Sequence, residues 1–467
     1  MFAATHVAAI YGKTRQSPTR EEPGHVPSSA AQWSKELRDR SSTPEPVMSL
    51  TAAGKSFQED AKGFTQSREH SHTVIVIGSG VAGLLTALHL SMKPGLGFHA
   101  TIIADEPPPP LNSEADTPRP FEPLDLSDEV MRYLDVVKLR SHVASCFCHP
   151  DAKAVRSWDG TLLQWTERPH PIADTHEFRR ILINVAVERG VQFMWNTRVI
   201  DMADVGWGVV CLLGDRSQTA ADLLVGCDGP QSMVRMAVEG GPDARRHSDP
   251  SGVLAFSAEF RDSAGALLSL VEQTQHFYGP NMTAHVCLFN DGLYKFQIYV
   301  SSAIDAKTSD NRAELKDGPL PLAYRNLMVL ARMNSPASHL IRLLSSGTAC
   351  PKLCRHICNI RPPLTRLAAG RMVVLGSASM AHDSPCFRPS LQPSLYCPLP
   401  LLWLTFFAVL PYIARQLSIL TSLMAKKAVP QQLGETLNDF SAAFLPVAQA
   451  ESCEFETLER QIATVRP

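Results

Sequence analysis

Residues 73–90 read TVIVIGSGVAGLLTALHL, and this stretch decides the fold of the chain. A continuous apolar run with the length of a buried strand comes first, and a glycine-rich turn follows it directly. After the turn, apolar residues recur at the spacing of one helical face, at Val81, Leu84, Leu85 and Leu88. The stretch therefore predicts a strand, a tight turn and a helix with one buried stripe, as in a Rossmann-like α/β domain.

The turn GSGVAG fits G-x-G-x-x-G, with Gly78, Gly80 and Gly83 at the fixed positions and Val81 and Ala82 between the last two. The first glycine permits the tight turn, the second lets a pyrophosphate approach the backbone, and the third lets the helix pack close to the strand. The helix N-terminus then faces the anion. Because a strand and a helix flank the turn as the motif requires, we predict that these five residues bind a dinucleotide.

A second apolar run, residues 100–104, ends in two acids, Asp105 and Glu106. In a dinucleotide fold, an acid at the end of the second strand holds the ribose hydroxyls, about 20 residues after the glycines. Asp105 lies 22 residues after Gly83. We predict Asp105 as that acid, with Glu106 as the competing candidate.

The composition excludes several classes of function. The 467 residues are 44% hydrophobic, which is typical of a globular chain with room for two or three domains. A formal net charge of -2 and the lack of a long basic run argue against nucleic-acid binding. The 11 cysteines are scattered, and no secretory signal precedes them, which favours a reducing, cytoplasmic setting.

Three cysteines, Cys350, Cys354 and Cys358, recur every four residues in CPKLCRHIC, an interval that would place thiols along one helical face. Standard zinc and iron–sulfur spacings do not match this interval. Buried or idle thiols are the favoured interpretation, and no metal site is predicted.

The stretch DLLVGCDGPQSMVR places Asp228 and Gly229 at the end of an apolar strand, with Ser232 and Arg235 starting a helix. With this pattern the chain resembles the FAD-dependent aromatic-hydroxylase family, the single-component flavoprotein monooxygenases that include salicylate and 4-hydroxybenzoate hydroxylases. The family pattern D-G-x-x-S-x-V-R lies beside both FAD and the visiting NAD(P)H. The resemblance implies FAD as cofactor, NAD(P)H as co-substrate, and Asp228 and Gly229 as cofactor-binding residues.

The stretch RMVVLGSASMAHDSP stands where the family has its third flavin motif. In the family a strand ends in Gly-Asp, the Asp binds the ribityl chain of FAD, and a glycine-rich loop follows. The resemblance implies Gly376, Ser377 and Ala378 as cofactor-binding residues, with Ser377 in place of the Asp. A charge-assisted hydrogen bond is typically worth about 1.5 to 3 kcal/mol, so this change is expected to weaken FAD binding roughly ten- to a hundredfold.

The chain departs from the family at two further places. The family usually has an arginine at the start of the helix near residue 176, where this chain has Thr175. We predict Arg180 as the substitute, with Arg179 as its alternative, and a solvated surface charge is an equal interpretation of either residue. The glycine-rich loop after the third motif is absent, and residues 389–414 form an uncharged, proline-interrupted apolar segment instead. A membrane span needs about 20 apolar residues, and the prolines leave too few uninterrupted positions for one. We therefore interpret this segment as an insertion from unspliced noncoding sequence, with a membrane contact through residues 395–410 as the alternative.

The resemblance implies an α/β fold with a Rossmann-like FAD-binding domain, a β-sheet-rich substrate domain and C-terminal helices. It covers residues 73–388 and resumes at about residue 413. The expected divisions are a disordered leader (1–70), the FAD-binding domain (71–250 and 361–388, with part of 106–175 on the substrate side), the substrate domain (251–360), the apolar insertion (389–414) and the C-terminal helices (415–467).

The predicted function is an FAD- and NAD(P)H-dependent monooxygenase, in which the reduced flavin activates O2 and one oxygen atom passes to a small organic substrate. The resemblance implies hydroxylation or epoxidation of an aromatic, polyketide- or terpenoid-like molecule in secondary metabolism. Since the cofactor carries the chemistry, no catalytic side chain is assigned. Candidate pocket residues in the β-rich middle, for which core packing is the favoured interpretation, are Phe256, Phe277, Tyr278, His285 and Phe296.

Two alternatives stay open. One is a degraded, weakly active or inactive flavoprotein relic, because the third motif and its loop are altered. The other is a hydrolase whose nucleophilic site combines Ser377 or Ser379 with His382 and Asp383. A catalytic triad needs the histidine between nucleophile and acid, and no G-x-S-x-G elbow is present, so the hydrolase is the weaker alternative.

Overall fold

The computed structural model describes residues 72–92, 98–109, 123–157, 161–240, 249–261, 274–279, 282–289, 293–301, 352–380, 387–390, 403–406, 409–426 and 432–464. The chain divides into two compact units, Met1–Phe57 and Gln58–Pro467, and every described residue belongs to the second. The leader expected over residues 1–70 lies outside the described residues.

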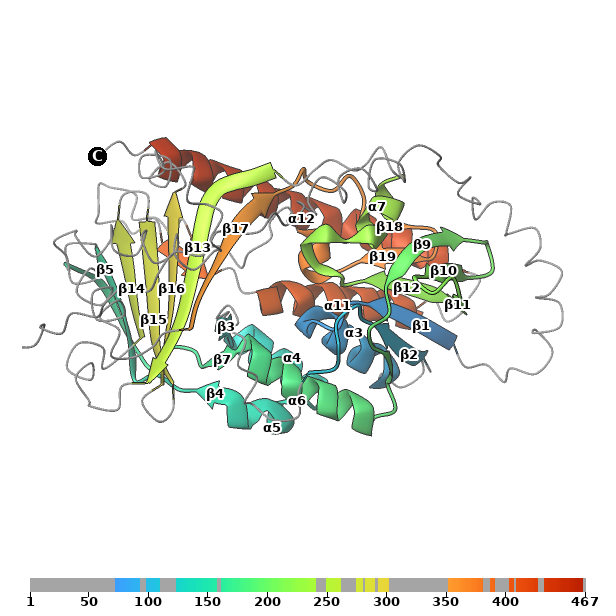
Figure 1. The fold of residues 1–467 in the computed structure, drawn as a ribbon, viewed down its shortest axis with the longest axis horizontal. Coiled ribbons are helices and arrows are strands. Elements are labelled where there is room, and N and C mark those ends of the chain that lie inside the picture. Colours follow the sequence, from blue (N-terminus) through green and yellow to red (C-terminus); the bar gives the residue numbers. More distant parts are fainter. Residues whose placement is uncertain are drawn as a thin grey trace, which may run out of the picture. The chain divides into compact units, whose positions relative to one another are not determined.

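A six-stranded sheet carries the fold predicted from residues 73–90 (Figure 1). All neighbouring strands are parallel except β18 and β19, which are antiparallel. Parallel strands are covered on both faces and therefore read as continuous apolar runs, and Val76 and Leu224 are indeed fully buried. The α/β prediction is confirmed. The strands, in spatial order, are β18 (Ala368–Ala369), β19 (Met372–Val374), β12 (Leu223–Gly226), β1 (His72–Ile77), β2 (Phe98–Ile103) and β8 (Gln192–Met194).

The helix after the glycine turn, α3 (Val81–Met92), is buried more completely than its sequence pattern predicts. Every residue from Val81 to Leu90 is buried, so the expected single buried stripe is wrong. The reason is that α3 packs on β1 and β2 and also contacts α6 (Thr175–Glu188) and α11 (Val409–Lys426) (Figure 1). Two of its buried polar residues have partners: Thr86 donates to the Ala82 carbonyl, and His89 Nδ1 lies 3.1 Å from the Tyr133 hydroxyl.

Two helix ends follow from local sequence. Helix α4 (Asp128–Val136) ends just before Lys138, which takes a left-handed conformation with φ +52°. Helix α6 begins at Thr175, because the Asp174 carboxylate accepts hydrogen bonds from the first helical N–H groups, including His176 N at 2.9 Å.

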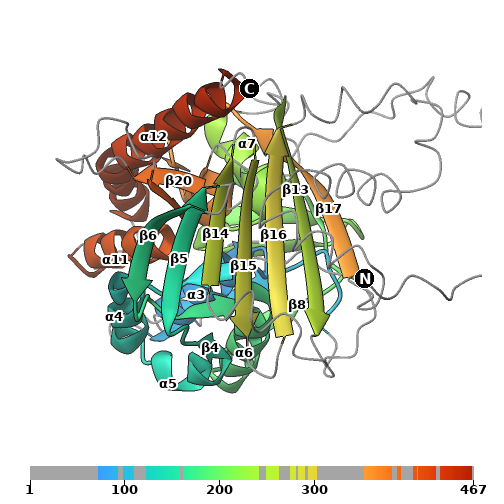
Figure 2. The same ribbon diagram turned by 90° about the vertical axis from the view of Figure 1, so that its left-hand side faces the viewer.

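A seven-stranded sheet forms the β-rich part of the chain (Figure 2). Neighbouring strands in this sheet are antiparallel, except that β5 and β14 are parallel to each other. Strands β5 and β6 come from the region before α6, so this sheet is assembled from segments far apart in sequence. Its order is β17 (Lys352–Ile360), β13 (Asp249–Arg261), β16 (Leu293–Ser301), β15 (Met282–Phe289), β14 (Thr274–Gly279), β5 (Ala152–Ser157) and β6 (Leu162–Glu167).

Strand β17 corrects the interpretation of the spaced cysteines. Cys354 and Cys358 lie on an extended strand, not on a helical face, and Cys350 lies outside the described residues. A strand rises about 3.3 Å per residue, against about 1.5 Å in a helix, so an interval of four does not bring the two positions together as the helical spacing suggested. Within the described ranges, no group of three or more histidines, cysteines or acids could hold a metal ion.

Three small sheets complete the described strands. They are β9 (Val199–Asp204), β10 (Val209–Leu213) and β11 (Gln218–Ala221); β3 (Pro123–Asp125), β7 (Ile172–Asp174) and β4 (Phe147–Cys148); and the pair β20 (Phe387–Ser390) and β21 (Trp403–Phe406). The remaining helices include α7 (Met233–Glu239) and α12 (Leu433–Thr464), which contacts α11 and β18.

The apolar segment, residues 389–414, is described only in part. Residues 403–406 pair with residues 387–390 as strands, and α11 begins at Val409, inside the expected insertion. Tyr412 and Ile413 are buried in the main core, so the last residues of the segment belong to a packed helix. Of the described helices, none has the length and apolar character that a membrane crossing requires.

Candidate functional site

The glycine turn, residues 78–83, has the shape that its motif requires because two of its glycines have no room for a side chain. A Cβ at Gly78, where φ is +103°, would overlap the Cys227 carbonyl, and a Cβ at Gly83 would overlap the Gly78 carbonyl oxygen. Gly80 differs, since no heavy atom lies within 4 Å of the position of its Cβ. The turn therefore presents an open backbone at Gly80 beside the N-terminus of α3, where an anion is favoured.

The ends of three strands bring the three sequence motifs together. Gly78 N donates to the Ile103 carbonyl at 2.9 Å, and Cys227 N donates to the Ile77 carbonyl at 2.8 Å. Leu375 N donates to the Gly226 carbonyl at 2.9 Å. The carboxyl ends of β1, β12 and β19 are thus neighbours, which is the edge where open α/β sheets bind ligands.

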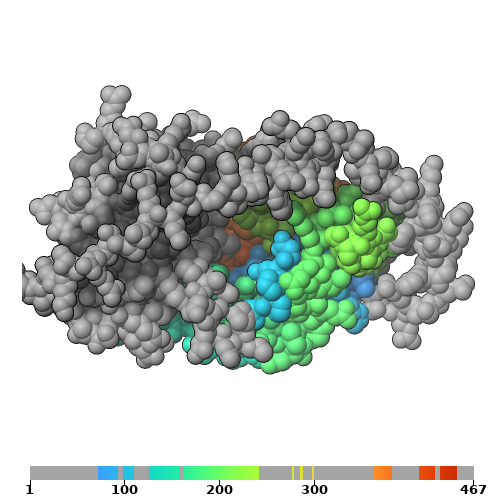
Figure 3. Space-filling model, viewed as in Figure 1, coloured from blue at the N-terminus to red at the C-terminus, as the bar shows by residue number. Residues whose placement is uncertain are grey.

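The acid that meets the glycine turn is Glu106. Its carboxylate accepts hydrogen bonds from the Ser79 hydroxyl and from Arg179, although Glu106, like Asp105, is an exposed residue. The exposed residues after β2, light blue in Figure 3, lie at the surface beside the green atoms of residues 161–240. The structure therefore brings the competing candidate, rather than the predicted Asp105, against the turn.

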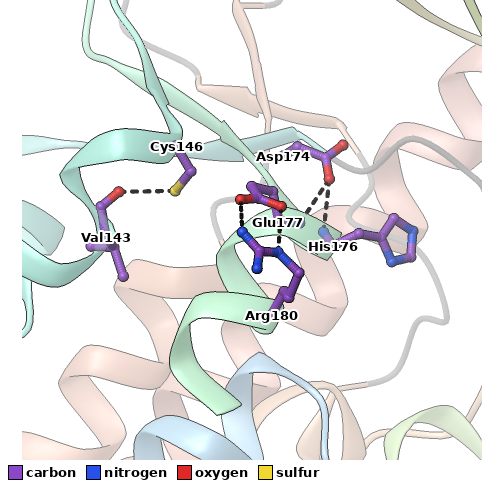
Figure 4. A network of polar contacts seen from close by, with 6 residues as sticks. All are labelled: Val143, Cys146, Asp174, His176, Glu177 and Arg180. Atoms are coloured by element: carbon purple, nitrogen blue, oxygen red, sulfur yellow. Dashed lines mark hydrogen bonds and ion pairs between the residues drawn. The ribbon is translucent and has the colours of Figure 1, made fainter. Parts of the chain in front are cut away.

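The two arginines of α6 have different surroundings. Arg179 Nε donates to the Ser79 carbonyl at 2.8 Å and its Nη2 donates to the Ser79 hydroxyl at 2.6 Å. Arg180, the predicted cofactor residue, instead pairs with Glu177 on its own helix, with Nε to Oε2 at 2.9 Å (Figure 4). The hydrogen bond to Glu177 raises the pKa of Arg180. Helical phase decides this difference, because adjacent residues on a helix point about 100° apart.

The second motif places Asp228 at the start of α7. Its Oδ2 accepts from Met233 N at 2.7 Å, while Ser232 caps the helix by accepting from Arg235 N at 2.9 Å. Asp228 Oδ1 is buried and, among the described residues, has no hydrogen-bond partner. Burial raises the pKa of this carboxyl. Gly229 has φ +72° and, like Gly80, open space where a Cβ would stand.

Arg235 connects the second motif to the third. Its guanidinium is buried and donates to the carbonyl of Met380 at 2.7 Å, to that of Ala378 at 3.4 Å, and to that of Pro362. Burial lowers the pKa of Arg235 to about 10, so the group is charged at neutral pH. One side chain therefore holds three carbonyl groups in and beside the third-motif loop, which we define as residues 376–380.

The third-motif loop is also held by α11. Gly376 N donates to Gln416 Oε1 at 2.8 Å, and Gln416 Nε2 donates to the Ser379 hydroxyl at 3.0 Å. Gly376 has φ +63°, and a Cβ there would lie 2.5 Å from the Ala82 Cβ, so the loop touches the glycine turn. Ser377 is half-buried and Ala378 is buried. The helix beyond the apolar segment thus reaches the site.

The hydrolase alternative gains nothing from this geometry. Ser379 already donates to the Gly376 carbonyl at 2.7 Å and lies 3.2 Å from the Tyr412 hydroxyl. His382 and Asp383 lie outside the described residues. Ser379 therefore stabilises the loop.

The site fits a dinucleotide on two observations. The open backbone at Gly80 leaves room for a phosphate, and the unpartnered Asp228 Oδ1 offers an acceptor to a hydroxyl or N–H group. Sequence reasoning did not identify Ser79, Gln416 and the position of Arg179. The only sequence feature that could have indicated the position of Arg179 was its helical phase relative to the turn. No sequence feature indicated Gln416, because it lies 40 residues beyond Gly376, the residue that it contacts.

Comparison with known proteins supports this assignment. A sequence model described as an FAD binding domain matches residues 71–279. Kynurenine 3-monooxygenase from Salinispora arenicola is 31% identical over 187 residues. That alignment covers 38% of this chain and 40% of the relative, so the chain matches less than half of that enzyme's length.

Solved structures share the fold at low sequence identity. Klebsiella pneumoniae HpxO, complexed with FAD and uric acid, matches with a TM-score of 0.61 and 17% identity over 84% of this chain and 89% of its own. CtdE, in complex with FAD and a substrate, matches with a TM-score of 0.62 and 16% identity over 82% of this chain and 87% of its own. P. aeruginosa PqsL, in complex with 2-aminobenzoylacetate, matches with a TM-score of 0.57 and 16% identity over 82% of this chain and 94% of its own. The chain therefore contains an FAD-binding domain over residues 71–279, its dinucleotide is FAD, and it shares the fold of these solved structures.

Proposed function

We propose that this protein is an FAD- and NAD(P)H-dependent monooxygenase that hydroxylates or epoxidises a small organic substrate. The observation that carries the proposal is the meeting of three motifs at one sheet edge, with an open backbone at Gly80 and an unpartnered oxygen on Asp228. When bound, FAD supplies the electron transfer and the activation of O2. The protein's own part is to bind and orient FAD and the substrate and to shield them from water.

The glycine turn and the N-terminus of α3 are the proposed pyrophosphate site, through Gly78, Gly80 and Gly83 with Val81 and Ala82 between the last two. Glu106 is the proposed acceptor for the ribose hydroxyls, in place of Asp105, since its carboxylate already accepts from Ser79. A carboxylate accepts two hydroxyl donors well, and a short hydroxyl–carboxylate bond is charge-assisted. This list of site residues is our proposal.

Arg179 is proposed as the positive charge beside the pyrophosphate, in place of Arg180. Its guanidinium donates to the glycine turn through the Ser79 carbonyl and hydroxyl, and it is largely buried. Arginine recognises phosphate with a planar set of donors. Arg180 is paired with Glu177 and is proposed as a structural residue.

The flavin end of the site is proposed to lie between Asp228, Gly229 and the third-motif loop, with Gly376, Ser377 and Ala378. Asp228 Oδ1 is the acceptor still open, and Ser377 stands where a carboxylate would bind the ribityl chain. A hydroxyl still donates and accepts, with less strength than a carboxylate. We therefore expect FAD to bind, and to be released more readily than from a site with both acids.

The substrate is proposed to be a small aromatic, polyketide- or terpenoid-like molecule of secondary metabolism. HpxO and PqsL are described with uric acid and 2-aminobenzoylacetate, both small organic molecules. We propose a cytoplasmic setting, in accord with the thiols of Cys146, Cys211 and Cys227, which form no disulfide among the described residues.

The test is to purify the full chain, reconstitute it with FAD and follow three readouts. We expect a yellow protein, oxidation of NADPH or NADH that a suitable substrate accelerates, and one labelled oxygen atom in the product when isotopically labelled O2 is supplied. A protein that stays colourless after reconstitution would overturn the proposal. If every substrate of a broad aromatic panel stays unmodified while NAD(P)H is oxidised and O2 is reduced to hydrogen peroxide, the protein is a flavin-dependent NAD(P)H oxidase instead.

A second candidate is a weakly active or inactive relic of the same family. The observation in its favour is Ser377 at the position of the ribityl-binding acid. This candidate predicts that the protein binds no FAD at physiological FAD concentrations. It also predicts that FAD binding returns when the acid is restored by Ser377→Asp. The dissociation constant of FAD for the two proteins separates this candidate from the active enzyme.

A further inference from the structure

The seven-stranded sheet contains a row of buried polar side chains that the proposed flavin site does not use. His276 on β14 lies opposite His285 on β15, and His285 lies opposite Gln297 on β16. Residues directly opposite one another share a face of the sheet. We call these three side chains the polar row, and each is at most 1% exposed.

The other face of the same three strands is apolar at the adjoining positions. Phe277, Ala284 and Ile298 are paired across β14, β15 and β16 and are at most 3% exposed. Packing therefore explains this face, and the core interpretation of Phe277 is confirmed. It does not explain Gln297, because burial of a polar group is unfavourable unless the group is hydrogen-bonded.

The two histidines of the polar row are neutral. Their ring centroids are 4.0 Å apart, and burial lowers the pKa of both well below the usual value, with the charge of Lys153 acting in the same direction. A neutral imidazole has one donor and one acceptor nitrogen. Cys287 Sγ lies 3.1 Å from His285 Nε2. Because His285 resists protonation, it does not stabilise a thiolate, and a nucleophilic cysteine is not supported.

Gln297 is the member of the row that points to a ligand. Its side chain is fully buried, and neither Nε2 nor Oε1 has a hydrogen-bond partner among the described residues. A primary amide with both groups unmet is rare in a folded protein and indicates a bound water or ligand. It offers a donor and an acceptor side by side.

We propose that the polar row binds the substrate of the proposed monooxygenase and selects an uncharged molecule with an N–H next to a carbonyl, such as a lactam. The lactam carbonyl would accept from Gln297 Nε2 while its N–H donates to Oε1. A carboxylate would satisfy Nε2 but repel Oε1, so an anionic group is disfavoured at this position. The inference rests on the proposed function and adds the substrate class.

The first experiment measures binding of three matched probes to the FAD-reconstituted full chain by titration calorimetry. The probes are 2-quinolone, its N-methyl derivative, which lacks the donor, and quinoline-2-carboxylate, which is anionic. We expect 2-quinolone to bind at least about tenfold more tightly than either of the others, because a site built on paired hydrogen bonds rejects analogues that leave one unmet. Equal, weaker or undetectable binding of 2-quinolone overturns the proposal.

The second experiment removes the amide. Gln297→Leu is expected to abolish the preference for 2-quinolone over its N-methyl derivative, while the thermal midpoint stays equal or rises because an unmet buried amide is gone. Ile298→Val, on the opposite face of the same strand, is the matched control and should keep the preference. If the leucine variant does not fold, Gln297→Met replaces it. A preference that survives removal of the amide overturns the proposal.

The test of the polar row can be separated from the test of the proposed monooxygenase function. Flavin occupancy and NADPH oxidation are measured on the same samples. A yellow, NADPH-oxidising protein that does not discriminate the probes overturns the polar-row proposal and leaves the monooxygenase standing. A colourless protein that discriminates them supports the polar row and overturns the monooxygenase.

Discussion

The glycine turn and the third-motif loop lie at the ends of strands in one sheet, yet different forces hold them. Backbone sterics fix the turn, since a side chain at Gly78 or Gly83 would overlap a neighbouring carbonyl. The loop is fixed mainly by side chains from elsewhere, through Arg235 of α7 and Gln416 of α11. A segment shaped by its own residues tolerates change elsewhere in the chain, whereas a segment held from outside depends on each distant partner.

The largest effect is expected at the glycine turn, for Gly83→Ala. The added Cβ would overlap the Gly78 carbonyl oxygen, which is backbone and cannot rotate away. We expect a loss of about 3 to 5 kcal/mol in the free energy of unfolding, with loss of FAD binding. Urea denaturation and the flavin spectrum measure the two effects.

Gly80→Ala is the matched control for this variant. Its Cβ would meet no protein atom, so the stability of the apoprotein should change by less than about 0.5 kcal/mol. FAD affinity should still fall, because the methyl group occupies the space proposed for the phosphate. Equal destabilisation by both alanines would contradict the view that local sterics set the turn.

A somewhat smaller effect is expected when the third-motif loop loses its brace, for Arg235→Met. The substitution keeps much of the apolar stem but leaves the carbonyls of Pro362, Ala378 and Met380 without their donor. We expect a loss of about 3 kcal/mol, because unsatisfied buried polar groups keep their desolvation penalty. Arg366→Met, at an exposed position, is the control and should change stability by less than about 0.5 kcal/mol.

The same comparison explains which parts of the molecule the sequence predicts. The strand, turn and helix of residues 72–92 follow from apolar periodicity and glycine spacing, which are visible within the segment itself. The β-rich character of the middle of the chain was also recognisable. The order of the strands in the seven-stranded sheet was not, since β5 joins β14 across more than a hundred residues of sequence.

The choice between neighbouring residues was beyond sequence reasoning at two points. Asp105 and Glu106 both end β2, and only the direction in which the chain leaves the strand turns Glu106 toward Ser79. Arg179 and Arg180 differ by one helical step, and the orientation of α6 against the turn decides which of them reaches it. Both choices differ by one residue, and both depend on tertiary geometry.

The third expected effect concerns the cofactor rather than stability. Ser377→Asp restores the acid of the family motif in the third-motif loop, and we expect it to tighten FAD binding roughly ten- to a hundredfold. Equilibrium titration of the apoprotein with FAD measures the change. Ser379→Asp is the contrasting variant, because Ser379 is buried and hydrogen-bonded to Gly376 and Gln416, and a carboxylate there should destabilise the loop instead. Unchanged FAD affinity in the first variant would contradict the proposed place of Ser377.

The smallest expected effect tests the unpartnered oxygen of Asp228. In the apoprotein, Asp228→Asn should raise the free energy of unfolding at neutral pH by about 1 kcal/mol, because a buried carboxylate with one unmet oxygen becomes a neutral amide. FAD affinity should fall in the same variant, because an acceptor proposed for the flavin is lost. Stability and cofactor binding therefore change in opposite directions, and Asp151→Asn, at an exposed position, should change neither.

The pH dependence of this difference follows from the raised pKa of Asp228. Burial raises the pKa in the folded state above the ordinary value of 3.8, so the penalty for the buried charge is fully present above the folded-state pKa. As the pH falls through that pKa toward 3.8, the folded protein takes up a proton at Asp228 and the penalty disappears. The stability advantage of the asparagine variant should therefore be largest at neutral pH and shrink on acidification. An advantage that stays constant or grows on acidification would show that the Asp228 carboxyl is not the source of the penalty.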